Sequence, residues 1–128
     1  MGKFVLSIGS NYGDKETEVT LAIEWLATLL RNFSKSNVYQ TKPAGNASLP
    51  YVNAVVAGRF DKPLEELDSL LKQYERERGR TVAMKKEGKV PIDIDVVVVD
   101  DRVIREWDYQ QSFFRKGASQ IIEDLVGI

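Results

Sequence analysis

Apolar residues along this chain follow two different spacings, one typical of strands and one typical of helices. Short β-rich or alternating runs, bounded by Gly, Pro, Asn and Asp, indicate strands. We predict four of them, at residues 4–8, 32–40, 51–60 and 92–99. Between them, apolar residues three and four positions apart predict two helices. The first is capped by Asp14 and runs to about Leu30, and the second starts at residues 61–63 and ends by Gly79.

The rest of the chain carries weaker signals. Residues 41–50 and 80–91 predict loops, a short fifth strand is predicted at 103–104, and a final helix at 119–126. The order of elements favours an α+β fold, the ferredoxin-like βαββαβ sandwich, in which two helices cover one face of an antiparallel sheet. We expect a single domain over residues 1–128. Because this fold hosts many functions, the function has to be argued from a site.

Composition narrows the possible chemistry. The chain has 128 residues, 43% of them hydrophobic and 29% charged, as in ordinary soluble domains. It contains neither Cys nor His, which excludes disulfides, thiolate or imidazole metal sites and His-dependent catalysis. The net charge of −1 argues against a general nucleic-acid binder, and no apolar stretch approaches the roughly 18 residues that span a bilayer. We therefore expect a cytoplasmic monomer that binds neither nucleic acid nor membranes.

Two carboxylates, Asp93 and Asp95, stand in the most apolar predicted strand. Residues two apart in a strand share a face and lie roughly 7 Å apart. Such a pair repels itself unless cations lie between its members, and Mg²⁺ is typically held by one or two carboxylates together with phosphate oxygens. The pattern therefore favours magnesium that bridges to a polyphosphate. The alternative is a pair of acids at a solvent-facing strand end.

A basic stretch precedes this pair. Residues 72–89 hold seven basic and three acidic side chains in a chain of net charge −1. Arg80, Lys85, Lys86 and Lys89 are candidates for binding the phosphates of a nucleoside triphosphate, since cations beside metal-binding carboxylates complement that ligand. The alternative is a solvated helix face followed by a surface loop.

An aromatic and an amide, Tyr51 and Asn53, share a strand face directly after a loop rich in Pro and Gly. Together they could stack on and hydrogen-bond a flat heterocycle, although an ordinary half-buried strand has the same pattern. Residues 9–14 form a glycine turn before a helix. That turn lacks the Gly-Lys-Ser/Thr of a P-loop, so it indicates only a tight, capped turn.

Taken together, five segments resemble the hydroxymethyldihydropterin pyrophosphokinase family of the folate pathway, which transfers the β,γ-diphosphate of ATP to a pterin hydroxymethyl oxygen. The resemblance covers residues 4 to about 104 and implies the ferredoxin-like fold. The segments are SIGSNYGD (7–14), YQTKPAG (39–45), YVNAVV (51–56), Glu75 with Gly79 and Arg80, and IDID (92–95).

The resemblance also implies roles for individual residues at the nucleotide side. Asp93 and Asp95 match two magnesium-binding acids, for two ions bound with ATP. Arg80 matches a phosphate-contacting arginine at the start of the catalytic loop. Glu75 matches a polar position beside the ATP site.

Four further residues match the pterin side. Tyr51 matches the aromatic that stacks on the pterin, and Asn53 the amide that hydrogen-bonds it. Thr41 and Ala44 match positions whose backbone lines the pterin pocket.

The chain departs from the family pattern in two places. Val90 occupies the position of a second arginine in the loop, and the loop tryptophan is replaced near Glu87. The segment after Ile104 lacks the family's Pro-His motif. It leaves open whether Arg115 and either Phe113 or Phe114 replace the arginine and the aromatic that close over the pterin.

Three hypotheses follow. The first is a pyrophosphokinase in which Asp93 and Asp95 hold magnesium and Arg80 offsets phosphate charge. The second is a degenerate relative that binds a pterin or nucleotide without turnover. The third is an unrelated ferredoxin-like domain that binds RNA, which residues 51–58 disfavour because they lack an aromatic-rich RNA-binding motif.

Overall fold

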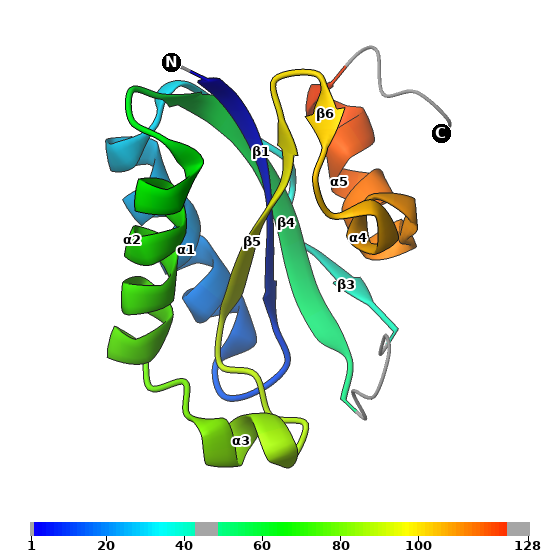
Figure 1. The fold of residues 1–128 in the computed structure, drawn as a ribbon. Coiled ribbons are helices and arrows are strands. Elements are labelled where there is room, and N and C mark those ends of the chain that lie inside the picture. Colours follow the sequence, from blue (N-terminus) through cyan, green and yellow to red (C-terminus); the bar gives the residue numbers. More distant parts are fainter. Residues whose placement is uncertain (1, 43–48, 123–128) are drawn as a thin grey trace.

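The structure, a computed structural model, describes residues 2–42 and 49–122 (Figure 1). The strands are β1 (Gly2–Ser10), β2 (Arg31–Lys35), β3 (Tyr39–Thr41), β4 (Tyr51–Phe60), β5 (Asp93–Val99) and β6 (Arg102–Val103). The helices are α1 (Lys15–Leu29), α2 (Leu64–Glu77), α3 (Val82–Lys86), α4 (Glu106–Gln110) and α5 (Ser112–Ile121). No helix in the described ranges is both long and apolar enough to cross a membrane.

The antiparallel sheet is built around β1, which pairs with β4 on one side and with β5 on the other. The strand order is β2-β4-β1-β5-β6, and β3 also pairs with β4. With α1 following β1 and α2 following β4, this is the order of the ferredoxin-like sandwich. The predicted fold class is therefore confirmed.

Helices α1 and α2 cover one face of the sheet (Figure 1). The even-numbered positions Phe4, Leu6 and Ile8 of β1 point to this face and are at most 2% exposed. The apolar side chains on this face of the strand pack against the apolar face of each helix and form the main core. The buried apolar residues of the two helices are Val19, Ala22, Ile23, Leu26, Leu67 and Leu71.

The opposite face is covered as well, which the sequence-based prediction missed. Helices α4 and α5 pack there, and Tyr109, Phe114 and Ala118 complete a second, smaller core with Val5 and Val97 (Figure 1). A single helix at 119–126 was expected, whereas α5 already ends at Ile121, and residues 123–126 lie outside the described part. The chain is extended at Gln111, between the two helices. Because of this break, the apolar residues of the two short helices do not follow one continuous helical spacing, so the sequence pattern did not predict either helix.

Two shorter segments also differ from the prediction. The strand expected at 32–40 is divided into β2 and β3, because Ser36 lies between them with its N–H bonded to Val55 O and its Oγ accepting from Val55 N. Residues 80–91 contain α3, where a loop was expected. Thr81 caps this helix, since its Oγ1 accepts from Met84 N at 3.1 Å.

Candidate functional site

A cavity of about 230 Å³ lies on the face of the sheet that α4 and α5 cover. Its floor consists of odd-numbered positions on three neighbouring strands. Gly9 on β1 is paired with Asn53 on β4 and with Asp93 on β5, and Ser7 is paired with Asp95. The predicted heterocycle and metal residues are thus neighbours across one central strand. The walls are completed by Thr41, Lys42, Tyr51, Arg105, Trp107, Asp108 and Phe113.

One end of the cavity is formed by Tyr51, Asn53 and Thr41. Asn53 is 2% exposed, and its Nδ2 donates to Thr41 Oγ1 at 2.5 Å. A Cβ at Gly9 would lie 2.9 Å from Asn53 Oδ1 and 3.2 Å from the Tyr51 ring, so only glycine allows this packing. Burial, and then the charge of Asp93, raise the pKa of Tyr51. The fourth predicted pterin residue, Ala44, lies outside the described residues.

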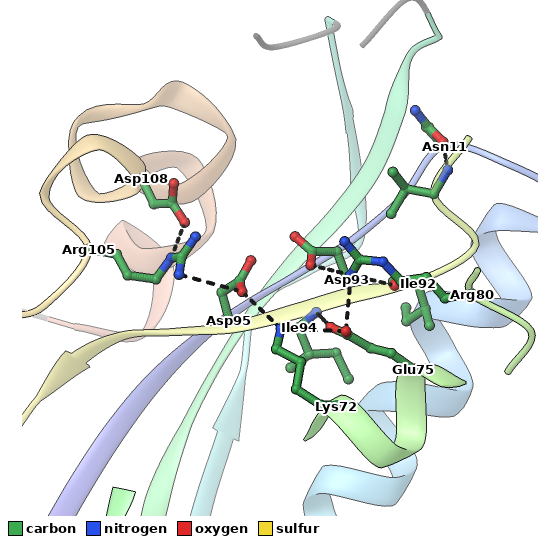
Figure 2. A network of polar contacts seen from close by, with 11 residues as sticks. Asn11, Lys72, Glu75, Arg80, Ile92, Asp93, Ile94, Asp95, Arg105 and Asp108 are labelled. Carbon is green, nitrogen blue, oxygen red and sulfur yellow. Dashed lines mark hydrogen bonds and ion pairs between the residues drawn. The ribbon is translucent and has the colours of Figure 1, made fainter. Parts of the chain in front are cut away.

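The other end holds Asp93 and Asp95, each beside cationic side chains (Figure 2). Arg80 Nη1 donates to Asp93 Oδ1 at 2.7 Å. Asp95 Oδ1 lies 3.6 Å from Lys72 Nζ and 3.9 Å from Arg105 Nη1. The two acids therefore share a face, as predicted, and their charge is met by cations from α2, from the segment after it and from the start of α4.

The two carboxylates titrate as a coupled pair. Burial, and then the negative charge of Asp93, raise the pKa of Asp95 from 3.8 to about 8. Burial alone would also raise the pKa of Asp93, but the hydrogen bond with Asp95 and the charge of Arg80 lower it. At neutral pH the pair therefore retains one proton, which relieves part of its repulsion.

Glu75, predicted beside the nucleotide, lies on α2 behind the carboxylate pair and is 3% exposed. Its Oε2 accepts from Ile94 N at 2.8 Å, and its Oε1 lies 3.0 Å from Arg80 Nη1 and 3.4 Å from Lys72 Nζ. Burial raises its pKa. The side chain thus holds β5 and two of the cations in place.

The three lysines predicted for phosphate binding are not drawn into this cluster. Lys85 and Lys86 end the short helix α3 and are exposed. Lys89 Nζ lies 5.3 Å from the centre of the Tyr12 ring and 3.2 Å from Glu87 Oε2. None of the three lies among the described residues that line the cavity.

Asn11, at the end of β1, holds the loop that carries Lys89. Its Nδ2 donates to Gly88 O at 2.8 Å, and its Oδ1 accepts from Val90 N at 2.6 Å. Its backbone N–H also donates to Val90 O at 2.9 Å. Asn11, which the sequence indicated only as part of a turn, therefore holds the loop in place.

The C-terminal segment resolves a question that the sequence left open. Phe113 lines the cavity, with its ring centre 6.0 Å from that of Trp107. Phe114 is buried in the second core. Arg115 donates instead to Tyr109 O and Gln110 Oε1 on α4. Of these three residues, only Phe113 lines the cavity.

Several cavity residues were missed from the sequence. Ser7 and Gly9 belong to the floor because their parity on β1 matches that of Asp93 and Asp95 on β5, a signal that the alternating pattern already contained. The wall residues from the C-terminal segment had no such signal, since the helices that carry them were not predicted. These are Arg105, Trp107 and Asp108.

Asp93 and Asp95 are the oxygen donors available for the magnesium that the resemblance implies. No group of three or more His, Cys, Asp or Glu within the described ranges forms a metal cage. Two oxygen donors that face a cavity, repel one another and share a proton still suit Mg²⁺, which takes its remaining ligands from water and phosphate. Asp93 and Asp95 therefore fit a metal that arrives with a polyphosphate.

Comparison with known proteins agrees with this geometry. Residues 5–122 match the family model described as 7,8-dihydro-6-hydroxymethylpterin-pyrophosphokinase. The 2-amino-4-hydroxy-6-hydroxymethyldihydropteridine pyrophosphokinase of Porphyromonas gingivalis is 39% identical over 99 residues, which cover 73% of this chain and 66% of the relative. The protein of the same name from Aquifex aeolicus is 34% identical over 106 residues, covering 82% and 66%. The chain belongs to the 7,8-dihydro-6-hydroxymethylpterin-pyrophosphokinase family.

Proposed function

We propose that this chain transfers the β,γ-diphosphate of ATP to the hydroxymethyl oxygen of 6-hydroxymethyl-7,8-dihydropterin, a step of folate biosynthesis. One observation carries the proposal. Gly9 is the direct cross-strand neighbour of both Asn53 and Asp93, so an aromatic-and-amide end and a carboxylate end share one cavity. A flat heterocycle and a metal-bound phosphate held there would lie beside each other. Membership of the family and the names of its relatives support the same reaction.

The pterin end recognises shape and hydrogen bonding. Tyr51 stacks on the ring, Asn53 hydrogen-bonds its polar edge, and the backbone at Thr41 and Ala44 completes the pocket. Phe113 forms the facing wall. Because Asn53 is already aligned by Thr41, it loses little freedom when the pterin binds.

The phosphate end binds charge. Asp93 and Asp95 would hold magnesium, for which we propose two ions with ATP. When bound, the metal would supply positive charge to the transferring phosphates and align them. Arg80 offsets further charge, and Glu75 keeps Arg80 in position. Lys85, Lys86 or Lys89, which do not line the cavity, would help Arg80 only where the phosphates extend beyond it.

The reaction forms a bond between the hydroxymethyl oxygen and Pβ and breaks the bond from Pβ to the oxygen that bridges it to Pα. AMP leaves, and the hydroxyl proton is released. Positioning and electrostatic stabilisation supply most of the catalysis in such transfers. We assign no protein side chain as the base. We expect the enzyme to act as a cytoplasmic monomer with ATP and the pterin as its partners.

A turnover assay tests the proposal. Purified protein is incubated with ATP, Mg²⁺ and 6-hydroxymethyl-7,8-dihydropterin, and AMP is measured. We expect AMP formation that depends on metal and pterin, and a sharp loss of Mg²⁺-dependent ATP affinity in Asp95→Asn. A protein that binds both ligands but forms no AMP would instead be a binding relative without turnover. ATP affinity that is equal with and without metal, in both proteins, would remove the acids from the site.

A further inference from the structure

Arg105 and Asp108 are charged residues of the cavity wall that have no part in the function proposed above. Arg105 lies just before α4, and its Nε donates to Asp108 Oδ2 at 2.8 Å. Both residues line the cavity. The Asp108 side chain is only 12% exposed, whereas that of Arg105 is 49% exposed. A nearly buried carboxylate thus anchors a guanidinium whose outer part remains accessible.

Arg105 differs from the other cations around the carboxylate pair. Lys72 approaches Asp95 from α2, and Arg80 binds Asp93 from the segment after α2, whereas Arg105 approaches from the side of α4 (Figure 2). Of these three cations, only Arg105 lines the cavity formed by the described residues. Together with Lys42, an exposed residue that also lines the cavity, Arg105 is therefore a cation that an anionic group of a ligand there can reach.

The contact between Arg105 and Asp95 is loose. Nη1 lies 3.9 Å from Asp95 Oδ1, beyond hydrogen-bond distance, while Asp108 takes up Nε. A divalent cation on Asp95 would use the same carboxylate and would repel the guanidinium at short range. The Nη groups would then be available to another anion, and the planar fork of arginine matches phosphate oxygens well.

We propose that Arg105 exchanges partners as the site fills. In the ligand-free protein its guanidinium lies against Asp95 on one side of the carboxylate pair, and with a divalent cation at Asp95 it binds a phosphate oxygen of the nucleotide. Asp108 is the positioning residue that keeps the guanidinium in the cavity. This inference rests on the proposed function, because it needs a metal and a nucleotide at the carboxylate pair.

Two binding measurements by calorimetry test the exchange. The first titrates Mg²⁺ alone, and the second titrates α,β-methylene-ATP in saturating Mg²⁺, an analogue whose Pα–Pβ bridge cannot be cleaved. Arg105→Ala removes a competitor for Asp95, so Mg²⁺ should bind more tightly. It also removes a phosphate ligand, so the analogue should bind roughly ten- to a hundredfold more weakly, the loss typical of a charge-assisted hydrogen bond. These opposite changes are not expected of a merely structural residue.

Three further variants separate charge from position. Lys72→Ala also removes a cation from Asp95, so it should strengthen Mg²⁺ binding without the large loss of analogue affinity. Arg102→Ala removes the same charge from an exposed position on β6 and should change neither. Asp108→Asn releases Arg105 from its anchor, so the analogue should bind more weakly although the charge of Arg105 remains.

The outcomes are distinguishable. If Arg105→Ala weakens Mg²⁺ binding, or leaves analogue affinity within twofold of wild type, the exchange is wrong. Arg105→Gln provides the same test if the alanine variant does not fold, as judged by circular dichroism. If the wild type neither binds the analogue nor forms AMP, the proposed function fails, and this inference fails with it.

Discussion

At the scale of single residues, Gly9 determines how the two ends of the cavity meet. An added Cβ would lie 2.9 Å from Asn53 Oδ1 and 3.2 Å from the Tyr51 ring. Gly9→Ala should displace both side chains and weaken pterin binding by roughly tenfold or more, since a misplaced polar partner costs about 1–3 kcal/mol. Fluorescence titration of the pterin measures this. Mg²⁺–ATP affinity and the melting temperature serve as controls, and a pterin affinity equal to that of wild type would contradict the assignment.

The acid pair gives a dependence of stability on pH. The raised pKa of Asp95, about 8, means that the folded protein keeps a proton that the unfolded chain releases above pH 3.8. The free energy of unfolding should therefore fall as pH rises from about 4 to 8, because the folded state binds more protons in that window. Asp93, whose pKa is lowered, titrates below this pH range.

Urea unfolding of the metal-free protein at pH 5 and pH 8 checks this prediction. Asp95→Asn is uncharged at every pH, so its gain in stability over wild type should be larger at pH 8 than at pH 5. Asp101→Asn, at an exposed turn position, is the matched control and should show no such trend. A difference between Asp95→Asn and wild type that is the same at both pH values would rule out the raised pKa.

At the scale of elements, one side chain joins the end of β1 to the loop after α3. Asn11→Ala removes the bonds to Gly88 O and Val90 N, while the backbone bond to Val90 O can remain. The Val90 amide should then exchange its hydrogen faster, and Mg²⁺–ATP should bind more weakly because the loop is no longer fixed. Hydrogen exchange by NMR measures the first effect. Unchanged protection of the Val90 amide would show that the side chain does not hold the loop.

The elements whose apolar residues follow a single regular spacing could be predicted from the sequence, and the elements without such a spacing could not. The strands and helices that form the main core carry clean alternation or a helical stripe, so their residues could be assigned to faces in advance. Helices α4 and α5 are short, and the extended Gln111 separates them. Their position against the sheet depends on Phe114 and Ala118 fitting beside β4 and β5, a tertiary contact that no local pattern contains.

The same reason explains the candidate site. The sequence could identify Tyr51, Asn53, Asp93 and Asp95, because residues two positions apart in a strand lie on the same face. Arg105 and Asp108 could not be identified, because they enter the cavity only through the way α4 packs. Lys85 and Lys86 were predicted near the acids only because of their charge. In the structure they lie at the exposed end of α3.

At the scale of the whole molecule, the balance of charge around the cavity predicts a slow enzyme. Val90 stands at the position where the resemblance implies a second arginine, and Lys89 lies against Tyr12 and Glu87. Val90→Arg should raise the rate of AMP formation, whereas Arg80→Ala should lower it by roughly 10²–10³, as for a lost positioned charge. Val82→Arg adds the same charge at a position that is 74% exposed and should leave the rate unchanged. Equal rates in the two arginine variants would show that position does not matter.

The pairing of Gly9 with both Asn53 and Asp93 has a consequence for how this chain tolerates change. Along β1, β4 and the first half of β5, one set of alternate positions forms the main core, and the other forms the cavity floor and part of the second core. Inserting or deleting one residue within any of these strands would exchange the two sets, placing carboxylates in the core and apolar side chains in the site. The segments of the three strands that carry the site can therefore vary in composition but not in length, and relatives that keep the reaction should confine their insertions to the connections between strands or to strand ends away from the cavity, as at the irregular register between β1 and β5 beside Val97.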